Sequence, residues 1–173
     1  MALVVDAARS RVVVETTAKG LLARLAHDLR IEARGVEGEA ISDTEVRATF
    51  PVDRMVVVQS RRHGSGPFGP PSESDKPTIE QKIRDEVFPG TRAIQVTAHL
   101  DGERATLDVD AGRGRQSVST TARVERAPSE VRASGTARLS LDALRAGQPH
   151  VPMGAIKLED TVEVRFEIVL VER

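Results

Sequence analysis

The stretch VRASGTARLSL, residues 131–141, alternates between small or apolar residues and polar ones along its whole length. Successive side chains of a β-strand point to opposite faces of the sheet, so a period of two predicts a strand with one buried and one solvated face. The apolar set is Val131, Ala133, Gly135, Ala137, Leu139 and Leu141, and the polar set is Arg132, Ser134, Thr136, Arg138 and Ser140. Residues 131–141 therefore predict a long, one-sided β-strand.

The same alternation recurs along most of the chain and decides the fold class. It is found in residues 29–33, 46–52, 94–100, 105–109, 118–124 and 162–170. Short turn-prone pieces such as Asp101-Gly102 and Pro128-Ser129 separate these segments, which indicates an antiparallel meander. Long strands that each have one apolar face and are joined by plain hairpins favour a closed barrel over two packed sheets. We predict a mainly β, antiparallel up-and-down β-barrel, with a β-sandwich as the alternative.

Two segments break the alternation and predict short helical elements. Apolar side chains recur at every fourth position in residues 76–88, and Thr78 with Gln81 fits a capping box at a helix start. We predict one short helix at about 78–86. A second helical turn is predicted at about 141–146, before the last strand.

Residues 59–75, QSRRHGSGPFGPPSESD, are rich in Gly, Pro and Ser. This composition is typical of a flexible loop. Because 173 residues suit one domain, we expect a single domain over residues 1–173 that contains this loop. The loop is interpreted as a solvated connection, and a functional lid is the alternative.

Composition excludes several classes of function. Lys plus Arg number 25 and Asp plus Glu 26, the formal net charge is -1, and Trp and Tyr are absent. A chain without a basic excess and with few aromatic platforms for bases is not expected to bind nucleic acid. The absence of Cys excludes disulfides, thiolate catalysis and Cys-based metal sites.

The sequence also bears on location. Charged residues, among them Asp6, Arg9 and Arg11, interrupt the first 15 residues, so these lack the apolar run of a signal peptide. A run of about 18 apolar residues, as a transmembrane helix needs, does not occur. We therefore expect a cytoplasmic protein without a transmembrane segment.

Motifs for chemistry are not evident. The four histidines are far apart in sequence, and none has a second His or a carboxylate at the spacing of a helical metal site; they are His27, His63, His99 and His150. A Gly-x-Ser-x-Gly nucleophile elbow is also absent. We predict no catalytic residue, no metal site and no cofactor, and we expect His99 to be exposed on the polar face of its strand.

His27 and Asp28 are neighbours at the start of an alternating segment, and such a pair invites a catalytic interpretation. A strand would direct the two side chains to opposite faces. The favoured interpretation is structural: Asp28 accepts backbone N–H groups, and His27 ties down a neighbouring loop. A hydrolase-type or metal-dependent enzyme that uses both residues is the least favoured hypothesis.

Segments spread over most of the chain resemble the YceI-like family of lipocalin-like β-barrels. Near the N-terminus these are SRVVVETTAKG, LLARLAHDL and RIEARGVEGEA. In the middle, TIEQKIRDEVFPGTRAIQVTAHL is similar to the family's helix and following strand, and Val87-Phe88 keep the family's Val-Leu or Val-Phe pair. Near the C-terminus, VPMGAIKLEDTVEVRFEI is similar to the entry into the family's last strand, through Gly154, Asp160 and Val162.

The resemblance implies a lipid-binding protein. Members of the family bind polyisoprenoids or other long apolar chains, so we expect the barrel to carry an isoprenoid or other lipid-like chain without chemical turnover. The small residues Ala133, Gly135 and Ala137 agree with this expectation, because small interior residues leave volume for a ligand or for a packed helix. The candidate tunnel-lining residues are Leu25, His27, Leu29, Ile31, Ala48, Phe50, Ile94, Val96, Ala133, Ala137, Leu139, Val164 and Phe166.

A second hypothesis is that the barrel is filled. The protein would then be a scaffold or interaction protein that acts through its loops, chiefly residues 59–75. A solid core beneath Ala133 and Ala137 would favour this alternative. The expected partner under the first hypothesis is an apolar small molecule, and a homodimer is left open.

Overall fold

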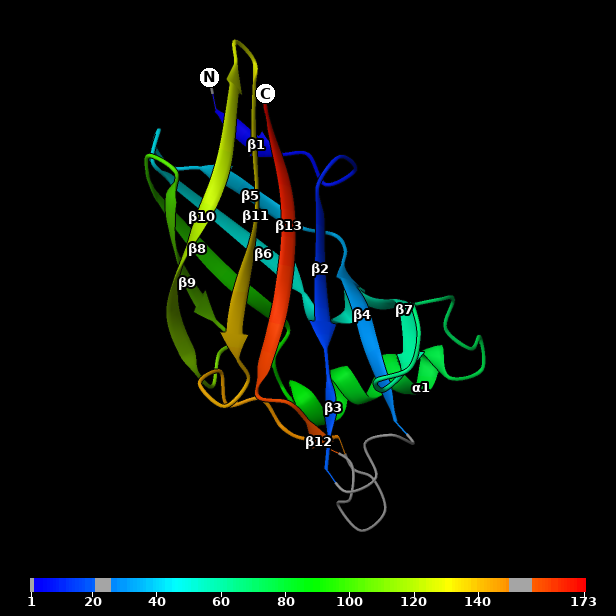
Figure 1. The fold of residues 1–173 in the computed structure, drawn as a ribbon. Helices are drawn as coiled ribbons and strands as arrows, with labels where there is room; N and C mark the ends of the chain where they lie inside the picture. Colours follow the sequence, from blue (N-terminus) through cyan, green and yellow to red (C-terminus); the bar gives the residue numbers. More distant parts are fainter. Residues whose placement is uncertain (1, 21–25, 150–156) are drawn as a thin grey trace.

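Eight strands form a closed antiparallel barrel in the computed structural model, which describes residues 2–20, 26–149 and 157–173 (Figure 1). Within these residues the ring runs β1-β5-β6-β8-β9-β10-β11-β13 and closes where β13 pairs with β1. Its strands are β1 (Leu3–Val5), β5 (Glu37–Ala40), β6 (Glu45–Pro51), β8 (Ala93–Asp101), β9 (Arg104–Asp110), β10 (Arg115–Ala127), β11 (Glu130–Ser140) and β13 (Thr161–Glu172). The predicted up-and-down barrel is confirmed.

A second arc of sheet branches from β13. Whereas β1 pairs with the C-terminal end of β13, β2 pairs with its N-terminal half, and the arc continues through β4 to the edge strand β7. These strands are β2 (Arg11–Thr16), β4 (His27–Ala33) and β7 (Met55–Arg62). A separate two-stranded ladder, β3 (Ala18–Lys19) with β12 (Lys157–Leu158), lies at the lower end of the molecule in Figure 1.

Local breaks in the strands produce this branching. Between β4 and β5 the chain turns at Gly35, whose φ of 69° is in the left-handed region that glycine adopts without strain. Between β6 and β7 it makes a single 3-10 turn, Val52–Arg54. At each break the chain passes between the closed ring and the outer arc: β5 and β6 belong to the ring, whereas β4 and β7 belong to the arc.

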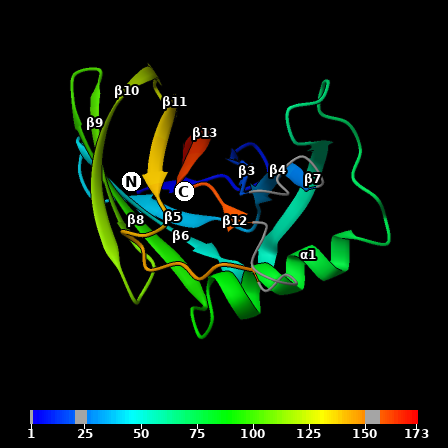
Figure 2. The same cartoon turned by 60° about the horizontal axis from the view of Figure 1, so that its bottom comes forward.

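One helical segment covers the lower end of the barrel beside β7. It comprises α1 (Lys76–Lys82) and the π-helical turn η3 (Ile83–Val87), and Figure 2 shows it crossing below the sheet. The predicted helix is confirmed, and it begins earlier than predicted, at Lys76. Pro77 fits into the first helical turn, where its missing N–H would be unpaired anyway. The predicted capping box is wrong: Asp75 is the N-cap residue, and its side chain makes no capping hydrogen bond.

Glu80 of α1 joins the helix to the edge of the sheet. Its carboxylate accepts a hydrogen bond from the backbone N–H of Val57 at 3.2 Å, and Val57 is 0% exposed. An edge strand presents backbone N–H groups that no neighbouring strand pairs. A buried N–H group of this kind destabilises the fold unless another acceptor binds it. Glu80 therefore satisfies a donor that the sheet itself leaves open.

We expect Glu80→Ala to lower the free energy of unfolding by about 1–2 kcal/mol, because the Val57 N–H would lose its acceptor. Glu80→Gln keeps an acceptor oxygen and should lose less than half of that amount. Urea denaturation followed by circular dichroism measures both, with Glu73→Ala at an exposed position as the control. Equal losses for the Ala and Gln variants would contradict this role of the hydrogen bond.

Two other predicted segments differ in detail. Residues 141–146 form hydrogen-bonded turns that begin with a helix-type bond from the Leu144 N–H to the Ser140 carbonyl. They do not continue as a helix, since Arg145 has a φ of 54° and left-handed residues end right-handed helices. Residues 59–62 belong to β7 and pair with β4, so the predicted loop is shorter and spans 63–75. Its flexibility stays a prediction.

Gly135 of β11 has no room for a side chain. A Cβ atom at this position would lie 2.8 Å from Cζ of Phe166 and 2.8 Å from the carbonyl oxygen of Thr121. Both distances are far inside normal van der Waals contact. Glycine is therefore required for the Phe166 ring to lie across β11 inside the barrel.

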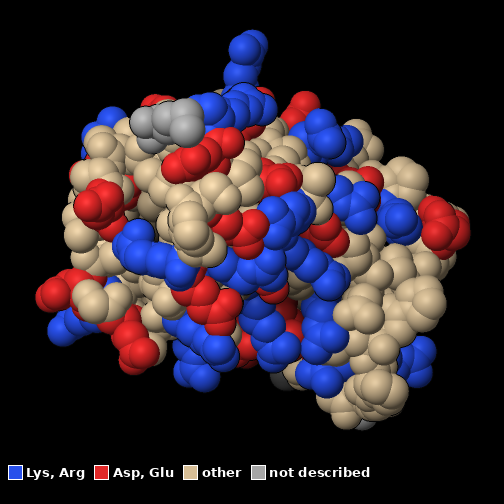
Figure 3. Space-filling view, turned by 90° about the horizontal axis from the view of Figure 1, so that it is seen from above, with Lys and Arg blue, Asp and Glu red and all other residues tan. Residues whose placement is uncertain are grey.

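Seen from above, the surface of the molecule mixes Lys and Arg side chains with Asp and Glu side chains (Figure 3). Pairs such as Arg132 with Glu167 (2.7 Å) and Arg30 with Glu15 (3.2 Å) connect adjacent strands. Partly exposed ion pairs of this kind each contribute little to stability. The more distinctive chemistry of the molecule is in its interior.

Candidate ligand-binding cavity

The strands of the barrel and of the outer arc line an apolar cavity of about 180 Å³. Its lining consists of aliphatic side chains, one methionine and two phenylalanines. A bound molecule would therefore be in contact with an apolar surface. The lining residues are Val12, Val14, Ala33, Val46, Ala48, Phe50, Met55, Ile94, Val96, Ala98, Leu100, Ala105, Leu107, Val109, Ala122, Ala133, Ala137, Leu139, Val164, Phe166, Ile168 and Leu170.

Alanines keep this space open. Seven of the lining residues are alanine, and Ala133 and Ala137 on β11 are two of them. A larger aliphatic side chain at either position would extend into the cavity, since both project from the inner face of the strand. The space beside Ala133 and Ala137 is thus hollow, which is the arrangement that the binding hypothesis expects.

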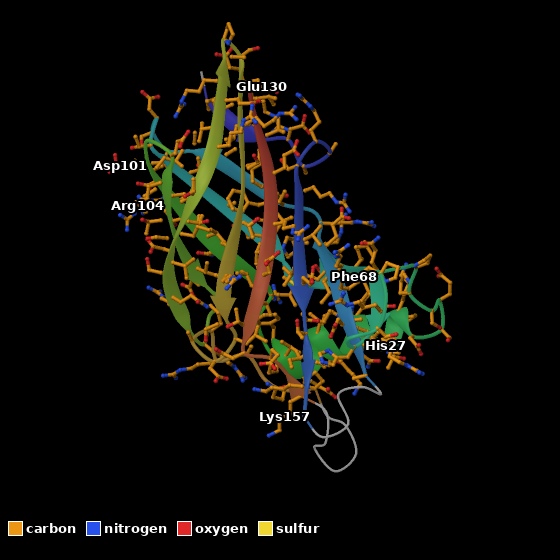
Figure 4. All side chains as sticks on the ribbon, in the orientation of Figure 1. His27, Phe68, Asp101, Arg104, Glu130 and Lys157 are labelled. Atoms are coloured by element: carbon orange, nitrogen blue, oxygen red, sulfur yellow. The ribbon has the colours of Figure 1, made fainter. Side chains whose placement is uncertain are left out.

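Nine of the thirteen candidate tunnel residues line the cavity: Ala48, Phe50, Ile94, Val96, Ala133, Ala137, Leu139, Val164 and Phe166. Ile31 is buried in the adjoining core, and Leu29 packs against that core without lining the cavity. His27 is exposed at the start of β4 (Figure 4), and Leu25 lies outside the described residues. That the nine residues bind a ligand stays a prediction.

Several lining residues were not among the candidates. Leu100, Leu107 and Ala122 lie on the inner faces of β8, β9 and β10, and the alternation of those segments already placed them on the apolar side. Val12 and Val14 belong to the continuous apolar run Val12-Val13-Val14, in which a period of two is not visible. The alternation of polar and apolar residues therefore indicates the inward position of Leu100, Leu107 and Ala122, but it does not indicate that of Val12 and Val14.

Asp28 is the centre of a buried polar cluster on the outer face of β4. It is 1% exposed, and its carboxylate accepts a hydrogen bond from the Ala18 N–H at 3.0 Å and from Arg61 Nε at 3.1 Å. Nδ1 of His63 lies 2.8 Å from Oδ1 of Asp28, the oxygen that also accepts the Ala18 N–H, whereas Arg61 contacts Oδ2. Burial acts to raise the pKa of Asp28, but the hydrogen bonds from Ala18, His63 and Arg61 together outweigh it and hold the pKa below its usual value.

The cluster tests the structural interpretation of the His27-Asp28 pair. Asp28 does accept a backbone N–H group, as expected. The expected tie to a loop is made by His63, not by His27, because strand alternation directs the exposed His27 away from the buried Asp28. The structure does not bring His27 and Asp28 together as a catalytic pair.

The loop after β7 packs on the same outer face. The guanidinium carbons of Arg30 and Arg61 lie over the ring of Phe68, 4.0 Å and 4.6 Å from its centroid; Figure 4 labels Phe68. Ser60 and Gly69 form a backbone bridge that closes the first part of the loop. Phe68 of the loop therefore packs on the outer face of β4 and β7.

A second polar cluster is centred on Asp160, whose carboxylate accepts hydrogen bonds from the Ser140 hydroxyl at 2.9 Å and from the Asp142 N–H at 2.7 Å. His99 is exposed, as predicted, with Nε2 3.3 Å from an Asp108 oxygen and Nδ1 3.9 Å from a Glu45 oxygen. In residues 2–20, 26–149 and 157–173, no three His, Asp or Glu side chains form a metal-like group. The same part of the chain contains no helix long and apolar enough to cross a membrane.

Comparison with known proteins identifies the fold. No family model and no curated protein matches the chain. Among solved structures, a polyisoprenoid binding domain from Saccharophagus degradans, implicated in plant cell wall breakdown, superimposes with a TM-score of 0.67 over 99% of this chain and 98% of that chain, at 12% identity. BcnA of Burkholderia cenocepacia gives a TM-score of 0.63 over 95% and 98%, also at 12% identity.

The chain has the fold of these two proteins. The fold that the resemblance to the YceI-like family implied is thereby confirmed over nearly the whole chain. At 12% identity the likeness concerns the barrel and not the ligand. What this particular barrel holds has to be argued from its own lining.

Proposed function

We propose that this protein binds the hydrocarbon part of an apolar molecule inside its barrel, without chemical turnover. The observation that carries the proposal is the cavity of about 180 Å³ whose lining is entirely apolar. The S. degradans domain, which has the same fold, is named for binding polyisoprenoids, and this supports the proposal. The filled-barrel alternative has no comparable support, since the space beside Ala133 and Ala137 is open.

The cavity volume limits how much of a ligand can be held. An apolar protein cavity of about 150 Å³ accommodates benzene, so 180 Å³ has room for about six to eight carbon atoms. Each buried methylene contributes about 0.8 kcal/mol, which gives a gross binding free energy of about 5–6 kcal/mol for seven of them. A long isoprenoid or fatty chain would therefore place one end in the cavity and would leave the remainder outside, unless lining side chains moved.

A series of primary alcohols of four to twelve carbons tests the proposal. We expect the affinity to rise by about threefold to fivefold per carbon up to about eight carbons and then to level off, because additional methylenes find no apolar space. Titrations followed by NMR of the Val, Leu and Ile methyl groups measure it. Mass spectrometry of an organic extract of the purified protein shows in addition which apolar molecules co-purify.

Ala133→Leu places extra carbon atoms in the cavity and is expected to weaken eight-carbon alcohol binding at least tenfold. The fold should be kept, because the added side chain enters existing space. Ala127→Leu, at an exposed position of β10, is the matched control and should bind as the wild type does. Unchanged binding by Ala133→Leu would exclude the cavity as the site.

A further inference from the structure

Thr16 has a buried hydroxyl without a hydrogen-bond partner. It is 6% exposed, and its Oγ1 is the one buried side-chain oxygen or nitrogen in the described part of the chain for which no partner is found. Buried hydroxyls in folded proteins are nearly always paired, because taking them out of water without a new hydrogen bond is destabilising. An unpaired group of this kind therefore requires a physical explanation.

The position of Thr16 relates it to the cavity. Thr16 is the last residue of β2, at the lower end of that strand in Figure 1. Val12 and Val14 line the cavity from the inner face of β2. Strand alternation puts Thr16 on the same face, as the next residue beyond these two lining residues. Its Cα partner on β4 is Leu29, which packs against the apolar core.

Among the side chains of the described residues, Thr16 alone offers a buried water molecule an unpaired partner. Ordered internal waters make about three hydrogen bonds, and they need two or more polar groups that are otherwise unsatisfied. In the described residues Thr16 supplies the one such buried side-chain group. A bound molecule that brings both a polar atom and an apolar body fits an isolated hydroxyl in an apolar wall better than water does.

We propose that the Thr16 hydroxyl anchors the polar end of the ligand, by a hydrogen bond to an uncharged oxygen at the end of a hydrocarbon chain that extends past Val14 into the cavity. The oxygen is that of an alcohol or a carbonyl. The anchored oxygen is uncharged, because one hydroxyl cannot replace the hydration of an ion. The inference rests on the proposed function and specifies the chemical class of its ligand.

The test compares 1-hexanol with n-hexane, which differ in one oxygen, in titrations followed by methyl NMR. Thr16→Val keeps the shape of the side chain and removes the hydroxyl. We expect it to weaken 1-hexanol binding about tenfold, the effect of one hydrogen bond, and to leave n-hexane binding unchanged. Thr16→Ser restores a hydroxyl and should restore 1-hexanol binding. The melting temperature of ligand-free Thr16→Val should rise, because the unpaired hydroxyl is gone.

The outcomes separate this inference from the proposed function. If the wild type binds both ligands and Thr16→Val affects neither, or weakens both equally, the anchor is overturned while the apolar site stands. If the wild type binds neither ligand, the proposed function itself fails, and the anchor fails with it. A selective loss of 1-hexanol binding that Thr16→Ser reverses supports the anchor.

Discussion

Replacing Asp28 by alanine is expected to lower the free energy of unfolding by about 3 kcal/mol. The 1% exposed carboxylate joins three parts of the chain: it accepts the Ala18 N–H of β3 and the Arg61 side chain of β7, and it contacts His63 at the start of the loop. Without it, a buried N–H and a guanidinium lose their acceptor. Urea denaturation followed by circular dichroism measures the loss, and Asp53→Ala at an exposed position is the control.

The pH dependence of this stabilisation has a definite sign. The pKa of Asp28 is lower in the folded protein than in the unfolded chain, where it is about 3.9, so the ionised group stabilises the fold above that pH. The stabilisation is lost as the pH falls through the lowered pKa of the folded state. We therefore expect the difference in unfolding free energy between the wild type and Asp28→Asn to be complete at pH 7 and to shrink below about pH 4. A constant difference between pH 7 and pH 3 would show that the ionised form is not what stabilises the fold.

Gly135→Ala is expected to be the next most destabilising change, by about 2–3 kcal/mol. The added Cβ would lie 2.8 Å from both the Phe166 ring and the Thr121 carbonyl oxygen. The ring can rotate away, but the carbonyl belongs to the strand backbone and moves only with β10. Calorimetry or urea denaturation measures the loss, and a displaced ring should also weaken ligand binding, since Phe166 lines the cavity.

Two further variants make the Gly135 result specific. Gly69→Ala is the matched control, since no atom lies within 4 Å of its added Cβ, and it should be neutral within about 0.5 kcal/mol. Combining Gly135→Ala with Phe166→Leu removes the ring contact and should recover part of the loss, while the contact with Thr121 remains. A cost below about 0.5 kcal/mol for Gly135→Ala alone would mean that β11 has more room than its glycine indicates.

The barrel and much of its lining could be predicted because they follow from one repeated pattern. Alternation places Ala133, Ala137 and Leu139 on one face of β11 whatever the neighbouring strands are, and closure of the sheet then turns that face inward. The same reasoning separates His27 from Asp28. Such features depend only on the two-residue period of a strand, and this period can be recognised from consecutive residues in the sequence.

Features that depend on contacts between distant residues could not be predicted. The pairing of His63 with Asp28 requires β7 to lie beside β4 with Arg61 opposite Asp28, and a bulge near Arg30 sets this register. The hydroxyl of Thr16 likewise becomes unusual only when folding buries it without a hydrogen-bond partner. In both cases the sequence shows an ordinary polar residue, and its role comes from the neighbours that folding provides.

The shared position of β13 determines the order in which this fold can assemble. β13 pairs with β11, β2 and β1, so it joins the closed ring to the outer arc. A growing chain that has not yet emerged from the ribosome through Glu172 has β1 and β2 without this partner, and the strand edges of β2 and β11 stay open to other chains. Because β1 and β13 lie far apart in the sequence, closure of the ring is a long-range and therefore slow step, and the edges of β2 and β11 stay exposed until β13 pairs with them.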